Sequence, residues 1–131
     1  MTAGAGIDRP DMEPASRHAA GREAWDAAAA AFDEAWLWHR WDAIEAYATW
    51  RDTVDRSFAL VDASAARRIL ALVPLRLVRG RGPFRRMFGR LESTGGPAFA
   101  TGLTAGERRN VERAVADHLW RLARADGVWR I

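Results

Sequence analysis

Eight arginines within 24 residues are the strongest chemical signal in this sequence of 131 residues. No acidic residue occurs between positions 63 and 91, and aromatic residues are interleaved with the arginines. Guanidinium groups bind carboxylate or phosphate oxygens in pairs, and they repel one another unless negative charge is supplied. The segment therefore predicts a nucleic-acid or anion-binding site made of Arg67, Arg68, Arg76, Arg79, Arg81, Arg85, Arg86 and Arg90.

The charges of the chain are segregated, although the formal net charge is only +3. Residues 1–62 hold twelve acidic residues and six arginines. Either these acids fold beside the arginine segment and cancel its field, or the arginines bind an external polyanion. Nucleic acid and an acidic protein surface are the partners that we expect. An anionic membrane surface is disfavoured, because the apolar residues of this segment are too scattered for an interfacial helix.

A second group of residues suggests a small anion pocket. If residues 43–61 are helical, Arg51 lies in the middle of the apolar face and Asp55 follows at i+4. The two side chains then either pair at the rim of a helix contact or line a pocket in which Arg51 and Arg40 hold a carboxylate or phosphate. The possible pocket is therefore Arg40, Arg51 and Asp55.

Arg113 and His118 match the Arg-x4-His spacing of the HEPN ribonucleases. The chain also resembles that family in its expected build, a small helical bundle. The resemblance implies that the two residues act on an RNA phosphodiester and its 2′-hydroxyl across a dimer. The alternative is that His118 is a core or rim residue, because it continues the apolar positions Val111 and Val115.

No cofactor or metal is expected. The chain has no cysteine, which excludes disulfides and thiolate metal ligands. His39 has no second ligand three or four residues away, so the metal and haem interpretations lack support. No serine stands in the context of a catalytic nucleophile. These residues favour a non-catalytic protein. The interpretation as a small enzyme stays open.

The elements that would position these residues are predicted to be helices. The stretch 32–61 contains four of the seven tryptophans and should organise the core. We expect helices at about 17–38 and 43–61, with a break near His39–Asp42 left open, and a third from Ser64 to Pro74. A fourth would occupy residues 83–92. The last, at about 105–125, begins with the capping box of Thr104 and Glu107 and ends before Gly127.

No segment shows sustained apolar–polar alternation, so the predicted fold class is all-α, a compact four- or five-helix bundle. Residues 1–15 should form a flexible N-terminal tail and residues 16–131 a single helical domain. No signal peptide or apolar run of membrane-spanning length is evident, so we expect a cytoplasmic protein that is not an integral membrane protein. The use of arginine without lysine, beside abundant alanine, is typical of a GC-rich genome.

These observations predict a small protein with a basic face that binds nucleic acid, or another polyanion, through the arginines of residues 67–90. The first alternative is a helical protein–protein interaction or regulatory module. A homo-oligomer is one form that such a module can take. The second is a small enzyme that acts on an anionic metabolite or RNA inside a helical bundle.

Overall fold

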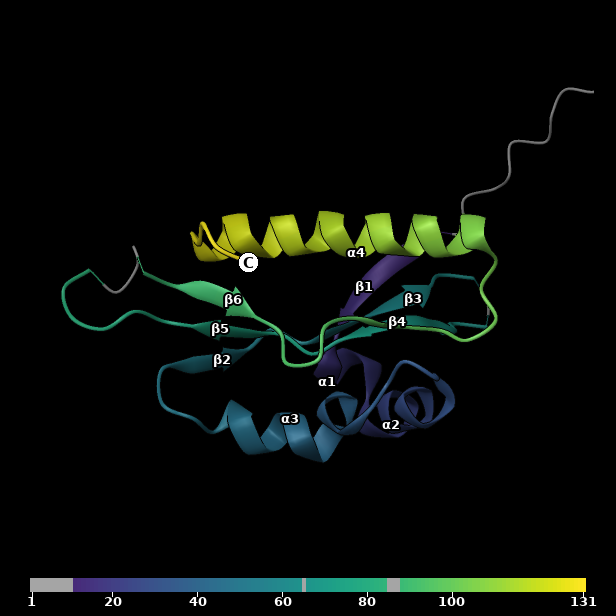
Figure 1. Cartoon of the computed structure of the whole chain (residues 1–131), viewed down its shortest axis with the longest axis horizontal. Helices are drawn as coiled ribbons and strands as arrows, with labels where there is room; N and C mark the ends of the chain where they lie inside the picture. Colours follow the sequence, from purple (N-terminus) through teal and green to yellow (C-terminus); the bar gives the residue numbers. More distant parts are fainter. Residues whose placement is uncertain (1–10, 65, 85–87) are drawn as a thin grey trace, which may run out of the picture.

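A computed structural model describes residues 11–64, 66–84 and 88–131 (Figure 1). Antiparallel strands form a central layer with helices on both faces. The helix α4 covers one face, and α1, α2 and α3 cover the other (Figure 1). In chain order the elements are β1 (Met12–Ser16), α1 (Arg17–Ala20), α2 (Arg22–Ala31), the 3-10 helix η1 (Leu37–His39), α3 (Trp41–Ala48), β2 (Thr53–Asp55), β3 (Phe58–Asp62), β4 (Ile69–Val73), β5 (Arg76–Val78), β6 (Arg90–Glu92), β7 (Ala98–Phe99) and α4 (Ala105–Asp126).

The predicted all-α bundle is therefore wrong. β3 and β4 pair with each other in the middle of a four-stranded sheet ordered β1-β3-β4-β7, and the second sheet is ordered β2-β5-β6. Residues 43–61 form α3, β2 and part of β3 instead of one helix, and the helix expected from Ser64 to Pro74 is replaced by β4. The described part of residues 83–92 contains β6 and no helix.

Burial on both faces explains why the strands were missed. Along β3, Phe58 and Leu60 pack toward α4, while Ala59 and Val61 pack toward Trp25 and the helices of the opposite layer. The sequence of a strand covered on both sides is a continuous run of apolar residues, without the alternation of apolar and polar residues that a half-exposed strand shows. The five-residue segments FALVD and ILALV are such runs, and periodicity cannot tell them from pieces of a buried helix.

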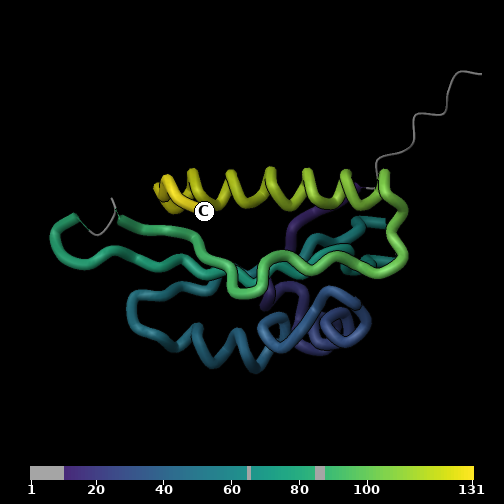
Figure 2. Tube along the Cα trace, in the orientation of Figure 1, coloured from purple at the N-terminus to yellow at the C-terminus, as the bar shows by residue number. Residues whose placement is uncertain are grey.

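The long central hairpin is interrupted where β2 gives way to β3 and β4 gives way to β5. Pro74 has no backbone N–H and is followed by Leu75, which does not continue the ladder. One backbone bond remains here, from the N–H of Arg56 to the carbonyl of Leu75 at 2.9 Å. The buried hydroxyl of Ser57 adds a second link, because it accepts a hydrogen bond from the N–H of Leu75 at 3.0 Å and donates one to its carbonyl at 3.2 Å. The pairs β3–β4 and β2–β5 are thus successive halves of one hairpin, which is flanked by β1 and β7 in the first sheet and by β6 in the second (Figure 2).

The break that the sequence left open near His39 is present, but the helix expected at about 17–38 is wrong in extent: it is divided into α1 and α2, and α2 ends at Ala31. His39 is fully buried between η1 and the loop that follows β6. Its Nδ1 accepts a hydrogen bond from the N–H of Trp36, and its Nε2 donates one to the carbonyl of Gly96 at 2.9 Å. The indole of Trp25 donates to the carbonyl of His39 at 2.7 Å. These bonds satisfy the polar groups that the end of a helix would otherwise leave unpaired.

The prediction of the last helix is confirmed. The hydroxyl of Thr104 accepts a hydrogen bond from the N–H of Glu107, and Gly127 ends the helix with φ 66° in the left-handed region. Val111 and Val115 face the sheet. Of the tail expected at residues 1–15, Met12–Ala15 belong to β1, and residues 1–10 lie outside the described part. Within the described ranges, none of the helices has the length and apolar character that crossing a membrane requires.

Candidate anion-binding surface

The antiparallel hairpin separates the eight arginines that are neighbours in the sequence. Arg67 and Arg68 lie at the turn between β3 and β4, at one end of the molecule. Arg79 and Arg81 lie in the loop between β5 and β6, at the other end (Figure 1). Arg85 and Arg86 lie outside the described residues. The segment therefore does not form a single cationic track.

Several of these arginines are paired with carboxylates. Arg76 donates from Nε and Nη2 to one oxygen of Glu92 at 3.1 and 2.9 Å, and Arg90 donates to the other oxygen. Burial raises the pKa of Glu92. The hydrogen bonds from Arg90 and Arg76 lower it by more, so the pKa of Glu92 lies below its usual range. Arg67 lies 3.3 Å from Glu13. Arg81 lies 3.9 Å from Asp52. Neutralisation by the N-terminal half of the chain, the alternative to polyanion binding, thus applies to Arg67 and Arg81.

Arg76 is also held by aromatic rings. Its guanidinium carbon lies 5.3 Å from the ring centre of Tyr47 and 5.2 Å from that of Trp50. Tyr47 contacts Trp50 on one side and Trp38 on the other, at centroid distances of 6.1 and 5.9 Å. A guanidinium fixed by a carboxylate and two rings is a structural element of this face and has little freedom to bind a phosphate.

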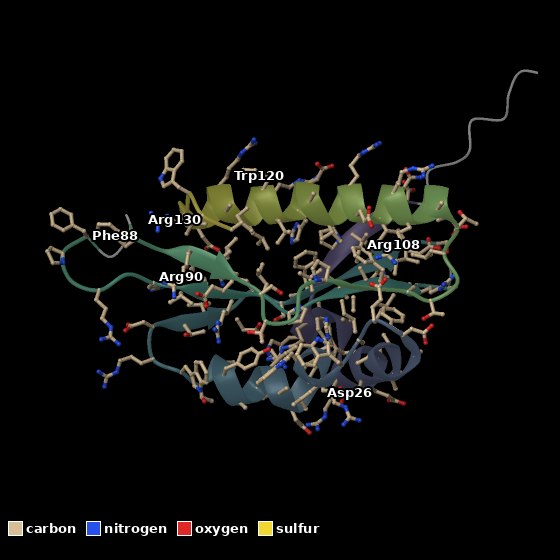
Figure 3. All side chains as sticks on the ribbon, in the orientation of Figure 1. Asp26, Phe88, Arg90, Arg108, Trp120 and Arg130 are labelled. Carbon is tan, nitrogen blue, oxygen red and sulfur yellow. The ribbon has the colours of Figure 1, made fainter. Side chains whose placement is uncertain are left out.

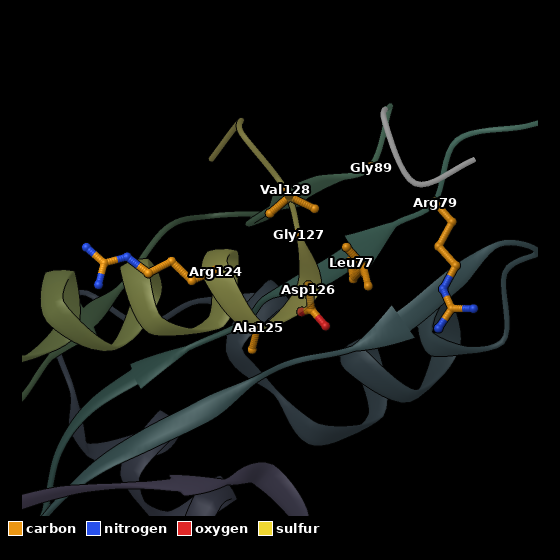
Figure 4. A pocket seen from close by; sticks show the side chains of 8 residues that line it. All are labelled: Leu77, Arg79, Gly89, Arg124, Ala125, Asp126, Gly127 and Val128. Carbon is orange, nitrogen blue, oxygen red and sulfur yellow. The ribbon is translucent and has the colours of Figure 1, made fainter. Parts of the chain in front are cut away.

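The end of the molecule that holds Arg79 and Arg81 gathers further arginines from distant parts of the sequence. The C-terminal residues run beside β6, where the N–H of Leu91 donates to the carbonyl of Arg130 at 3.1 Å. The last turn of α4 brings Arg124 to the same end, where it lines a pocket with Arg79 (Figure 4). Among the described residues, Arg79, Arg124 and Arg130 have no carboxylate partner.

The segments that carry these arginines also carry exposed aromatic rings. Phe84 and Phe88 in the loop between β5 and β6 are 59% and 63% exposed, and Trp129 is 91% exposed. Large apolar side chains gathered on a surface indicate an interaction site more often than isolated ones do. We name this region the basic–aromatic end, and it comprises Arg79, Arg81, Phe84, Phe88, Arg90, Arg124, Trp129 and Arg130.

A pocket of about 580 Å³ lies within the basic–aromatic end (Figure 4). Leu77, Gly89 and Val128 contribute its apolar part. Arg79 and Arg124 stand on opposite sides of it, and their guanidinium groups do not converge (Figure 4). Asp126 also lines the pocket, but both of its oxygens accept hydrogen bonds from Arg56, at 2.9 and 2.8 Å. The arginines are therefore directed along the surface and do not close on a single ion inside the pocket.

The possible pocket of Arg40, Arg51 and Asp55 does not assemble. Arg40 precedes α3, and Arg51 is exposed in the turn after it, so the two arginines lie at opposite ends of this helix. Asp55 belongs to β2 and accepts a hydrogen bond from Nε of Arg17 at 2.8 Å. The pairing of Asp55 with Arg51 was wrong because the helix on which it depended does not form. The buried Arg17 carried no periodic signal in the sequence.

Arg113 and His118 lie on different sides of α4. Arg113 is exposed, whereas the ring of His118 contacts Phe58 edge-on, with 4.5 Å between centroids. Burial, with a smaller contribution from Arg121, lowers the pKa of His118. Two residues that face opposite directions cannot act together on one phosphodiester within this chain. This geometry fits the interpretation of His118 as a partly buried packing residue.

The described part of the chain contains no group of three His, Cys, Asp or Glu side chains that is arranged to hold a metal ion. No protein-family model, curated protein or solved structure matches this chain. Its function must therefore be inferred from the surface described above.

Proposed function

We propose that this protein binds single-stranded nucleic acid at the basic–aromatic end. The observation that carries the proposal is that exposed rings and arginines without carboxylate partners among the described residues occur in the same segments at one end of the molecule. Phe84, Phe88 and Trp129 supply the rings, and Arg79 and Arg124 line the pocket at this end.

Each kind of side chain has a separate task in such a complex. Arginines that contact phosphates release counterions from the strand, which makes the affinity depend on salt and carries no sequence information. An aromatic side chain stacks on any base and contributes roughly 1–3 kcal/mol per base. The expected ligand is thus a single strand bound with little sequence preference. A duplex hides the faces of its bases and would use only the arginines.

The spread of the guanidinium groups supports a chain-like ligand over a small anion. Arg79 and Arg124 lie on opposite sides of the pocket, and their guanidinium groups do not converge (Figure 4). Two arginines that held one phosphate or carboxylate would converge on it. Arginines directed outward can instead contact successive phosphates of a strand that crosses this end of the molecule.

The test is a titration of a fluorescently labelled single strand of about four nucleotides, measured by anisotropy between roughly 50 and 200 mM salt. Replacement of Arg79 and Arg81 by glutamine should lower the slope of log K against log salt by up to about 1.4, because each lost contact contributes about 0.7 for a single strand. Phe88→Ala should weaken binding about tenfold and leave the salt slope unchanged.

The matched control replaces Arg22 and Arg40, which lie in the layer of helices on the other face of the sheet. The change in net charge is the same, so a general effect of charge would appear equally in both double variants. Binding that is absent in the wild-type protein, or that falls equally in the control, would contradict the proposal.

A further inference from the structure

The outward face of α4 carries a second set of arginines. Arg109, Arg113, Trp120 and Arg124 follow one another at i, i+4, i+11 and i+15, a spacing that places them in one stripe along the helix. All four side chains are exposed, and Trp120 is 60% exposed. The opposite side of the helix packs on the sheet, so the stripe faces away from the molecule (Figures 1 and 3).

The stripe is cationic because nearby carboxylates are engaged elsewhere. Arg108 forms ion pairs with Glu34 of the opposite layer and with Glu112 of α4. The carboxylate of Glu112 is therefore already paired with Arg108. Asp126 is held by Arg56. Among the described residues, Arg109 and Arg113 have no ion-pair partner. Asp117 is the acidic residue beside the stripe, so the stripe keeps a net positive charge.

Arg124 belongs both to the stripe and to the basic–aromatic end, which makes the two surfaces continuous. A helix rises about 1.5 Å per residue, so Arg109 and Arg124 are separated by about 22 Å along the axis. A stacked strand rises about 3.4 Å per nucleotide, so this length corresponds to roughly six nucleotides.

We propose that a strand bound at the basic–aromatic end continues along α4, with a base stacked on Trp120 and phosphates on Arg113 and Arg109. The inference rests on the proposed function and extends its binding site. A base can stack on Trp120 only if its face is free, which selects a single strand over a duplex. The stripe offers a membrane little apolar area, because its other exposed neighbour, Ala116, is small.

The experiment compares two strands of one repeated base, one of about four nucleotides and one of about twelve, which exceeds the roughly six that span the stripe. The double variant Arg109→Gln and Arg113→Gln should weaken binding of the longer strand roughly 25-fold at 0.1 M salt, since each contact of a single strand is worth about fivefold at that concentration. Binding of the shorter strand should not change. Trp120→Ala should weaken the longer strand about tenfold.

The control is again the double variant of Arg22 and Arg40, with the same change in net charge on the other face of the sheet. If wild-type protein binds both strands and the α4 variants bind the longer one as tightly as the wild type does, the extension along α4 is wrong and the proposed function stands. If wild-type protein binds neither strand, both proposals fail. If the protein binds vesicles that contain phosphatidylserine and binds neither strand, nucleic-acid binding is contradicted and an anionic membrane surface is indicated as the ligand.

Discussion

Arg17 and Glu45 are joined by a hydrogen bond of 2.7 Å from Nη2 to Oε1, although the arginine is only 1% exposed. Arg17 also donates to Asp55 and lies over the ring of Trp41, 4.1 Å from its centre. The buried cation therefore links the start of α1 to α3 and β2. These contacts hold Nε and Nη2, whereas the buried Nη1 has no hydrogen-bond partner among the described residues. The two carboxylates and the ring of Trp41 therefore offset the cost of burying the charge.

Removal of Arg17 should destabilise the protein strongly. Arg17→Ala leaves the largely buried Asp55 without its counter-charge, which costs about 3–5 kcal/mol in the free energy of unfolding. Arg22→Ala, which breaks an exposed pair with Asp42, should cost no more than about 1 kcal/mol. Urea unfolding of both variants measures the difference. Equal losses would mean that the buried pair contributes no more than a surface pair.

Gly95 should tolerate alanine much less well than its neighbour Gly96. Both have a positive φ, 91° and 69°, so both substitutions carry a backbone cost. A Cβ on Gly95 would lie 2.8 Å from Nε1 of Trp36 and 3.3 Å from Cε1 of His39, whereas a Cβ on Gly96 meets nothing within 4 Å. We expect Gly95→Ala to cost about 1–3 kcal/mol more than Gly96→Ala. Thermal unfolding of the pair tests this, and the reverse order would contradict the contact.

Glu92 should contribute stability that is lost in acid. Its pKa in the folded protein lies below the usual value of 4.5, so the contribution is complete above that value and disappears as the pH falls through the lower, folded-state pKa. Glu92→Gln should reduce the free energy of unfolding by about 1 kcal/mol near neutral pH, after allowance for solvent screening. Once the pH has fallen below the folded-state pKa, the variant and the wild-type protein should converge. A difference that does not change with pH would contradict this assignment.

Protonation of His118 should also make the protein less stable in acid, at a higher pH than the protonation of Glu92. Because its pKa is lowered from the usual 6.5, the neutral ring is the form favoured in the folded protein. The contribution is complete above 6.5 and is lost as the pH falls through the folded-state pKa. His118→Leu keeps an apolar side chain against Phe58 and should show a smaller loss of stability between about pH 7 and 5 than the wild-type protein. Parallel urea titrations at several pH values measure the difference, and equal losses would exclude His118 as the source.

Local signals in the sequence were sufficient for α4 and insufficient for the sheet. Thr104 and Gly127 mark the two ends of that helix, and its apolar stripe needs no information from elsewhere in the chain. The central strands have no such markers. Phe58–Asp62 became a strand because β1 and β4 pair with it on both sides and helices cover both faces. These are long-range contacts, and tertiary context decides between helix and strand for a short apolar run.

The candidate site was predicted in part. Arg79 and Arg81 belong to the basic segment found in the sequence and lie at the basic–aromatic end. Arg124 and Arg130, which join them, come from a part of the chain more than 40 residues away. Conversely, Arg76 stands opposite Glu92 in the pairing of β5 with β6, a register that the sequence alone did not reveal. Closeness in the sequence was therefore a poor guide to which charges share a surface.

The hydroxyl of Ser57 has a consequence for how the hairpin opens. Beyond this side-chain link, β2, β5 and β6 are only three residues long, while β3 and β4 have five residues each in the middle of the other sheet. The shorter half can fray while the longer half remains closed. Amide hydrogen exchange should accordingly be faster at Leu77 than at Leu72. Ser57→Ala should widen that difference in exchange rate. The basic–aromatic end can thus change shape while the core stays folded.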